Sequence, residues 1–231
     1  MAGFGAILAA HRYKLGVVGL LAAASVVCIA LVAARTLYSG SPGYAGLVWN
    51  LFLAWIPFVL AYLAYVLSWR RPLMYFVIAA FAGLWLIFFP NAPYIITDFK
   101  HLADPHIVVP AWYDVMVLMW FSWTGLLLGI VSLYLMHDIV HREFGRWVGW
   151  ALVFAVSVLS GLGVYIGRFI RWNSWDLLTD PVRIAQEFMQ GAQDPSLRSI
   201  GFTVTFAAFF LFIYLMLYSF GHLLQERGHV E

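Results

Sequence analysis

The sequence predicts an all-α polytopic membrane protein, a six-helix transmembrane bundle with short interfacial helices in the third and fifth loops. Of its 231 residues, 64% are hydrophobic and 10% are charged, whereas a soluble domain is about half apolar and roughly a quarter charged. Six stretches reach or approach the about 20 apolar residues that a helix needs to cross a bilayer. None of them alternates apolar and polar residues as β-barrel strands do. These observations exclude a disordered chain, a nucleic-acid-binding protein, a coiled coil and a soluble enzyme.

Each predicted span is nearly free of ionisable residues, apart from Arg35 at the end of the first. The first run has 23 residues, more than the about 7–15 of a signal-peptide core, so we expect a retained span. The third has only 17, and we expect it to be little tilted or to run past Pro90. The single integral membrane domain covers residues 1–231, with spans at 15–37, 45–68, 73–89, 115–136, 147–166 and 201–220.

The only cysteine, Cys28, lies in the middle of the first span. One cysteine excludes an intrachain disulfide and a cysteine-cluster metal site. No nucleophile elbow, phosphate-binding glycine loop or dinucleotide fingerprint is present. The sequence therefore assigns no metal, and any cofactor and any catalytic residue stay unknown.

Six spans place both chain ends and the second and fourth loops on one face of the membrane. That face carries seven basic and four acidic residues, and the opposite face carries six basic and seven acidic residues. Basic residues in short loops favour the cytoplasm, so the strings WRRP and HREFGR predict cytoplasmic termini. The third and fifth loops, which hold the two densest polar clusters, then share the extracytoplasmic face.

The first cluster reads FFPNAPYIITDFKHLADPH. Pro90 and Pro93 lack a backbone donor and disfavour helix in the residue before them. We therefore expect the third helix to end near Phe89, with the Asn91 side chain bonding to the freed backbone. Apolar residues at helical spacing follow Pro93, which predicts a short helix that lies at the interface or re-enters the membrane.

Asp98 and His101 are three residues apart on this short helix and should face the same way. A carboxylate and an imidazole could hold a metal ion or act as acid and base. Asp104, His106 and Asp114 follow, and Asp104 with Pro105 predicts a turn. The commoner explanation of such spacing is a capped loop that faces water.

The second cluster, GRFIRWNSWDLLTDP, follows the fifth span directly. Arg168 and Arg171, three residues apart on one helical face, would form a fork for phosphate or carboxylate groups. Equally, they could pair with Asp98, Asp114 or Asp176 and lock the outer loops together. The tryptophans here are typical of a membrane interface, and Asp180 with Pro181 predicts the start of a short helix at 181–190.

Two further patterns concern helix packing. Gly125-x-x-x-Gly129 and Gly163-x-x-x-Gly167 indicate faces where helices approach closely, either within one chain or between two. His137 and His141 have the i, i+4 spacing of metal ligands, but we interpret them as part of a solvated helix end.

The strings FFPNAPYIITDFKHL and GRFIRWNSWD resemble the two signatures of an uncharacterised bacterial multipass membrane-protein family, domain of unknown function thirteen sixty-one. The resemblance runs from about the second span to the sixth and implies a bacterial plasma (inner) membrane location, but no activity. It implies these motif positions: Pro90, Asn91, Pro93, Tyr94, Thr97, Asp98, His101, Arg168, Arg171, Asn173, Trp175 and Asp176.

Three functions stay open at this point. The favoured hypothesis is a non-catalytic accessory or scaffold protein with a polar extracytoplasmic site for a lipid head group, an anionic ligand or a partner membrane protein. The alternatives are an enzyme acting on a lipid or lipid-linked substrate, and a small-solute transporter. A transporter should show ionisable or strongly polar groups within its spans, or paired broken helices, whereas the interiors of the predicted spans offer only Ser, Thr and Asn50. We expect the protein to contact membrane lipids and to bind no nucleic acid. The predicted ligand-binding residues are Asn91, Tyr94, Asp98, His101, Asp114, Arg168, Arg171, Asn173, Trp175 and Asp176.

Overall fold

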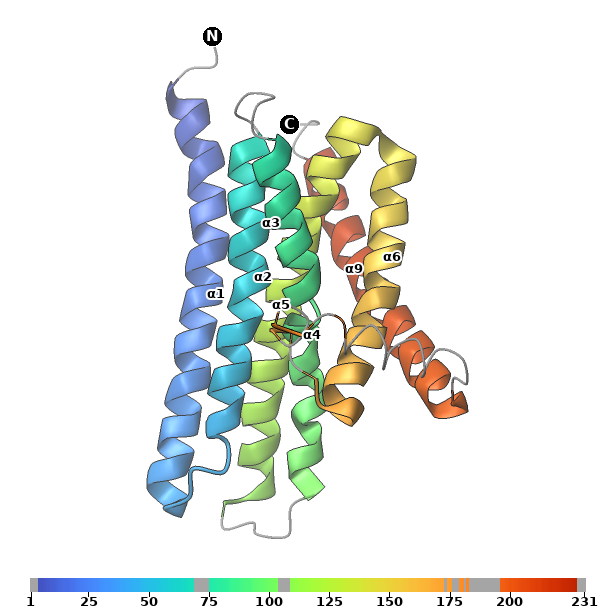
Figure 1. Ribbon diagram of the computed structural model, residues 1–231. Helices are drawn as coiled ribbons and strands as arrows, with labels where there is room; N and C mark the ends of the chain where they lie inside the picture. Colours follow the sequence, from blue (N-terminus) through green and yellow to red (C-terminus); the bar gives the residue numbers. More distant parts are fainter. Residues whose placement is uncertain are drawn as a thin grey trace.

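The chain folds into a bundle of helices (Figure 1). The computed structural model describes residues 4–68, 75–103, 109–172, 174–175, 179–180, 182 and 196–227. Within them, six helical stretches are long and apolar enough to cross a membrane, which confirms the predicted fold class. The elements are α1 (Phe4–Ser39), α2 (Ala45–Ser68), α3 (Tyr75–Phe88), α4 (Asn91–Tyr94), the 3₁₀ helix η2 (Ile95–Ala103), α5 (Ala111–Phe144), α6 (Arg146–Tyr165), the π-helix η3 (Ile166–Ile170) and α9 (Leu197–Arg227).

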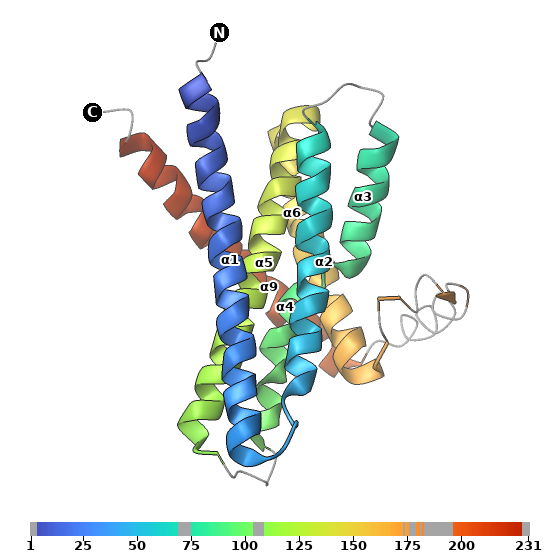
Figure 2. The same cartoon turned by 90° about the vertical axis from the view of Figure 1, so that its left-hand side faces the viewer.

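The two ends of the bundle differ in which segments they carry. The start of α1, the end of α9 and the turn between α5 and α6 lie at one end, which we call the terminal end (Figures 1 and 2). The turn between α1 and α2 and the start of α5 lie at the other, the distal end. Gly145 makes the sharp turn between α5 and α6. Its φ of 89° is a backbone conformation that residues with a side chain rarely adopt. This arrangement agrees with the expected division of the loops.

Helix α5 is the centre of the bundle. It packs against α1, α2, α4, η2 and α6, and 56% of its most apolar window is buried, against 22% in α1 and in α9. The outward faces of the helices carry many exposed large apolar side chains, as expected for a protein whose solvent is lipid. The polar side chains of α5 therefore need hydrogen-bond or ion-pair partners from the neighbouring elements.

The third span is broken. Helix α3 ends at Phe88, one residue from the predicted end, and the Asn91 side-chain amide donates to the Phe88 carbonyl at 2.9 Å, as expected. The chain then continues inside the bundle as α4 and η2, packed between α2 and α5, and the apolar stretch runs on to Leu102. The interfacial helix predicted for the third loop is therefore not confirmed, because this segment is the distal half of the third span.

Apart from Val182, the helix predicted at 181–190 in the fifth loop lies outside the described residues. The turn predicted at Asp104 and Pro105 does so as well.

Glycines on α5 and α6 leave room for the segment at which the third span breaks. A Cβ added to Gly125 of α5 would lie 2.7 Å from the Ala92 carbonyl oxygen, and one added to Gly163 of α6 would lie 2.6 Å from Cγ of Pro90. Contacts that short are not possible, so only glycine fits at these positions. The two small-residue patterns thus serve close packing within one chain.

Gly125→Ala tests this packing, with Gly83→Ala as its control. The added methyl group at Gly125 meets backbone, and overpacking costs typically about 1–3 kcal/mol. At Gly83, in the interior of α3, nothing lies within 4 Å, and alanine should gain up to about 1 kcal/mol of helix propensity. Thermal unfolding in detergent should show Gly125→Ala below and Gly83→Ala at or above the parent protein. Equal midpoints for the two variants would contradict the close approach.

Candidate functional site

The centre of the candidate site is a buried ion pair between the two sequence clusters. Nη2 of Arg168, in η3, lies 2.6 Å from Oδ1 of Asp98, in η2, and the side chains are 8% and 2% exposed. The other carboxylate oxygen, Oδ2, accepts a hydrogen bond of 2.8 Å from the Asn50 side-chain amide of α2. Both oxygens of Asp98 are therefore occupied, and the carboxylate ties α2 and η3 to the broken third span.

Thr97 and Tyr94 complete the shell around the Arg168 guanidinium. The Thr97 hydroxyl accepts from Nε of Arg168 at 2.7 Å and also from Nη2, and it donates to the Tyr94 carbonyl at 2.7 Å. The guanidinium carbon lies 4.2 Å from the centre of the Tyr94 ring, a cation–π contact. Gly167 leaves room for this ring, since a Cβ there would lie 3.3 Å from it.

The π-helix η3 explains why Arg168 and Arg171 separate. The Arg171 amide donates to the Ile166 carbonyl at 2.9 Å, an i to i+5 bond that widens the last turn of the fifth span. Arg171 then leaves the helix in the left-handed conformation, with φ of 67°, and its side chain is exposed. The helical spacing that would place both arginines in one fork does not hold, because Arg168 turns into the bundle and Arg171 turns out.

Two further contacts join the second cluster to the rest of the bundle. The Asn91 side-chain amide donates to the Ser174 hydroxyl at 2.8 Å. The rings of Trp175 and of Trp49 on α2 meet edge to face, with centroids 6.4 Å apart. The two clusters are thus one connected unit.

A second polar unit lies nearer the distal end, where α1 turns into α2 and α5 begins. Asp114 pairs with Arg35 of α1 through two hydrogen bonds of 2.7 and 3.1 Å, and both side chains are buried. Tyr44 stacks on this guanidinium at 3.8 Å, and the His101 ring lies 5.8 Å from the Tyr44 ring. Asp114 and His101 therefore belong to this second unit, whereas Tyr94, Thr97 and Asp98 hold Arg168.

The structure thus divides the predicted ligand-binding residues into separate groups. Tyr94, Asp98 and Arg168 meet directly, Asn91 and Trp175 join them through other contacts, and Asn173 and Asp176 lie outside the described residues. His106, a further candidate from the sequence, lies outside them too.

Sequence reasoning missed the partners Asn50, Arg35, Tyr44 and Ser174. A signal did exist for Asn50 and Arg35, because a polar side chain inside an apolar span needs a partner. The expectation that the span interiors hold only Ser, Thr and Asn50 as polar residues is wrong, because Asp98, Asp114, His137 and Arg168 also have buried side chains in the helical stretches.

In the unit around Asp98 the charged groups pair with one another. A general base must reach a proton on its substrate, whereas the Asp98 oxygens already bind Arg168 and Asn50. Among the residues that the structure describes, no three His, Cys, Asp or Glu side chains gather as metal ligands would.

Fold and polar network together define a polytopic helical membrane protein. Residues 49–217 match a family described as a protein of unknown function, DUF1361, and the chain belongs to this family. No curated protein and no solved structure matches the chain.

Asp98→Asn should destabilise the protein strongly. It leaves the Arg168 charge buried without a counter-charge, and breaking a buried pair costs about 3–5 kcal/mol. Asp138→Asn is the matched control, because Arg142 and Asp138 form an i, i+4 pair at 3.1 Å with side chains 28% and 35% exposed, and such pairs contribute about 0.3–0.5 kcal/mol. Unfolding free energies in mixed micelles measure both. Similar losses in the two variants would show that the Asp98 charge is not buried.

Proposed function

We propose that the protein is a non-catalytic accessory or scaffold protein of a bacterial plasma membrane, which binds an anionic group at its distal end. The phosphate of a lipid head group is the ligand that best fits the charge and the position. The polar units around Asp98 and Asp114 then serve to hold the frame, and Arg171 is the residue that binds.

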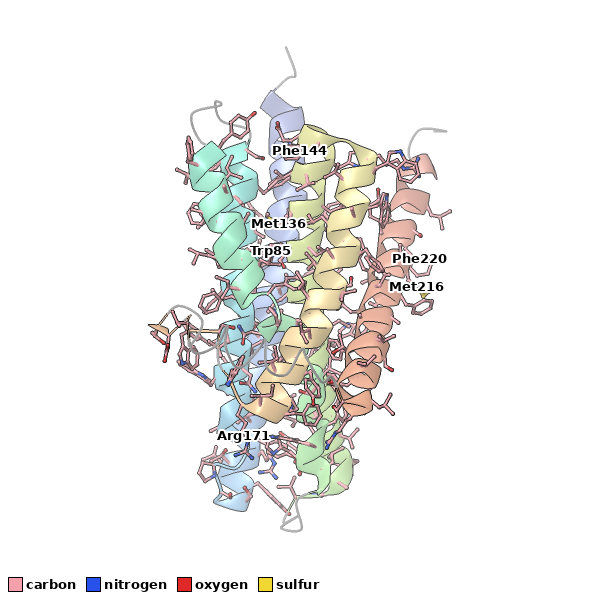
Figure 3. The ribbon with its side chains drawn as sticks, turned by 45° about the vertical axis from the view of Figure 1, so that its right-hand side comes forward. Trp85, Met136, Phe144, Arg171, Met216 and Phe220 are labelled. Carbon is pink, nitrogen blue, oxygen red and sulfur yellow. The ribbon has the colours of Figure 1, made fainter. Side chains whose placement is uncertain are left out.

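The observation that carries this proposal is the placement of Arg171. It is exposed, and no described carboxylate lies within ion-pair distance of it. Its left-handed backbone costs a non-glycine residue roughly 1–2 kcal/mol, and such strain clusters at functional sites. Figure 3 shows Arg171 toward the distal end, at the opposite end of the bundle from Phe144. A guanidinium there is suited to phosphate at a membrane surface.

Arg171→Gly separates binding from stability. Glycine removes the charge and also the strain of the left-handed conformation, so the protein should unfold at an equal or higher temperature. We expect it to bind phosphatidylglycerol about tenfold more weakly in phosphatidylcholine nanodiscs, a loss of about 1.4 kcal/mol, as measured by native mass spectrometry.

Arg146→Ala is the control, because Arg146 is exposed at the terminal end and its loss should leave this binding unchanged. If Arg171→Gly binds the anionic lipid as well as the parent protein does, the proposal fails. If instead it loses a co-purifying membrane protein, the ligand is a protein partner.

The proposal also places the terminal end in the cytoplasm, as the basic loops indicate. Cys28 is buried, so single cysteines can report sidedness on a Cys28→Ser background. Ser41→Cys, in the exposed α1–α2 turn, should react with an impermeant maleimide added to intact spheroplasts. Glu143→Cys, exposed at the end of α5, should react only after permeabilisation. The reverse pattern would invert the orientation.

Transport is the second candidate, and a specific observation favours it. Transporters place binding sites at broken helices, and the third span breaks between Phe88 and Asn91 while the fifth ends in a π-turn. The lipid measurement separates the two candidates, because a solute site inside the bundle would not depend on the exposed Arg171.

A further inference from the structure

A histidine is buried near the terminal end, far from the polar units already described. His137 of α5 is 2% exposed, and its Nδ1 lies 2.7 Å from the Tyr214 hydroxyl of α9. Its Nε2 is buried and has no hydrogen-bond partner. The solvated helix end expected from the sequence is found at His141, which is exposed, but not at His137.

The unpartnered nitrogen faces helix α6. A Cβ added to Gly149 would lie 3.0 Å from Nε2, so a glycine is needed there for the ring to fit. The Trp150 ring lies 4.9 Å from the imidazole ring, and the Tyr218 ring of α9 lies 5.7 Å from it. The imidazole thus fills the junction of α5, α6 and α9, where Gly149 leaves room for a ring but supplies no acceptor to Nε2.

Each neutral form of the His137 ring leaves one buried donor without an acceptor. With the proton on Nδ1, the ring donates to the Tyr214 oxygen, and the Tyr214 hydroxyl cannot donate back to it. With the proton on Nε2, the Tyr214 hydroxyl donates to Nδ1, and the Nε2 hydrogen has no acceptor. In the protonated ring both nitrogens carry a hydrogen, so Nδ1 donates to the Tyr214 oxygen and the Nε2 hydrogen stays without an acceptor.

We propose that His137 is a proton-binding site, which is loaded from the terminal end and controls the packing of α6 against α5 and α9. In the protonated ring Nε2 carries a hydrogen that points at Gly149, and a positive charge lies among aromatic rings. The charge is stable only if the junction opens to admit water or to turn the ring. The neutral site keeps the three helices closed, and the protonated site loosens them.

The groups around the ring make His141 the entry route. His141, one turn nearer the helix end, lies 5.9 Å from His137 between ring centroids. Asp138 is already paired with Arg142, and this arginine lies 5.5 Å from the Tyr65 ring of α2. Tyr134 on α5 and Tyr214 and Tyr218 on α9 are further titratable groups of this region.

Trp150 reports the event, because a protonated imidazole quenches an adjacent indole. The intact protein in nanodiscs should show a reversible drop in tryptophan emission between about pH 8 and about pH 5, the range in which histidine titrates. His137→Gln, whose side-chain amide can still bond to Tyr214, should lose that step, and so should Trp150→Phe, which leaves His137 in place. His141→Gln should keep it.

The proposal is overturned if the step is missing from the parent protein, if it persists in His137→Gln, or if it disappears only in His141→Gln. If His137→Gln does not fold, ¹⁵N NMR of selectively labelled histidine in the parent protein decides. A His137 signal that shows no protonation between about pH 8 and about pH 5 would refute the site, because that is the range in which a histidine switch acts.

Discussion

The rest of this structure depends on one ion pair, in which the Asp98 carboxylate and the Arg168 guanidinium lie 2.6 Å apart inside an apolar bundle. Neither Asp98 nor Arg168 could stay charged there alone, because an isolated ion is far too costly to bury. The pair must also satisfy its remaining donors and acceptors, and Asn50 and Thr97 do so. Four elements of the bundle, α2, α4, η2 and η3, have to converge on one point for this to happen.

Two departures from regular α-helix follow from that requirement. The third span breaks after Phe88, so that the 3₁₀ segment η2 can present Asp98 toward α2 and η3. The fifth span widens into a π-turn that points Arg168 inward and releases Arg171 in the left-handed conformation. Gly125 and Gly163 make the break possible, because Gly125 lets the Ala92 backbone of α4 come close and Gly163 lets the Pro90 ring come close. Irregular backbone inside a membrane is tolerated where other protein segments cover it.

The polar groups of the bundle are also separated by function. The distal half holds two neutralised ion pairs, which bring together segments distant in sequence. The terminal half holds a buried imidazole, His137, whose Nδ1 contacts the Tyr214 hydroxyl and whose Nε2 has no hydrogen-bond partner. A structural role fits the first set, whose members are fully partnered. The His137 imidazole is suited to respond to pH, since the uptake of a single proton changes its charge.

Much of the fold could be predicted from the sequence, because length and hydrophobicity determine a membrane span. The six spans, the shared face of the third and fifth loops and the helix end near Phe89 all follow from such local signals. The partner of each charge could not be predicted in the same way. Asp98 and Arg168 are 70 residues apart, and several carboxylates were equally available to each arginine.

Local rules also failed where the backbone departs from an α-helix. Helical spacing placed Arg168 and Arg171 on one face, and the π-turn at Ile166–Ile170 overrides it. Arg35, at the end of the predicted first span, was given no partner, and its side chain is buried against Asp114, 79 residues further along the chain. Both outcomes depend on contacts between distant parts of the chain.

The most direct test of this account is a double-mutant cycle on Asp98 and Arg168. Unfolding free energies would be measured for Asp98→Asn, Arg168→Gln and the double variant. If the two charges support each other inside the bundle, the double variant is less destabilised than the sum of the single variants, by about 2 kcal/mol or more. Losses that add to within about 0.5 kcal/mol would mean that the pair does not join the two clusters, and the account would be wrong.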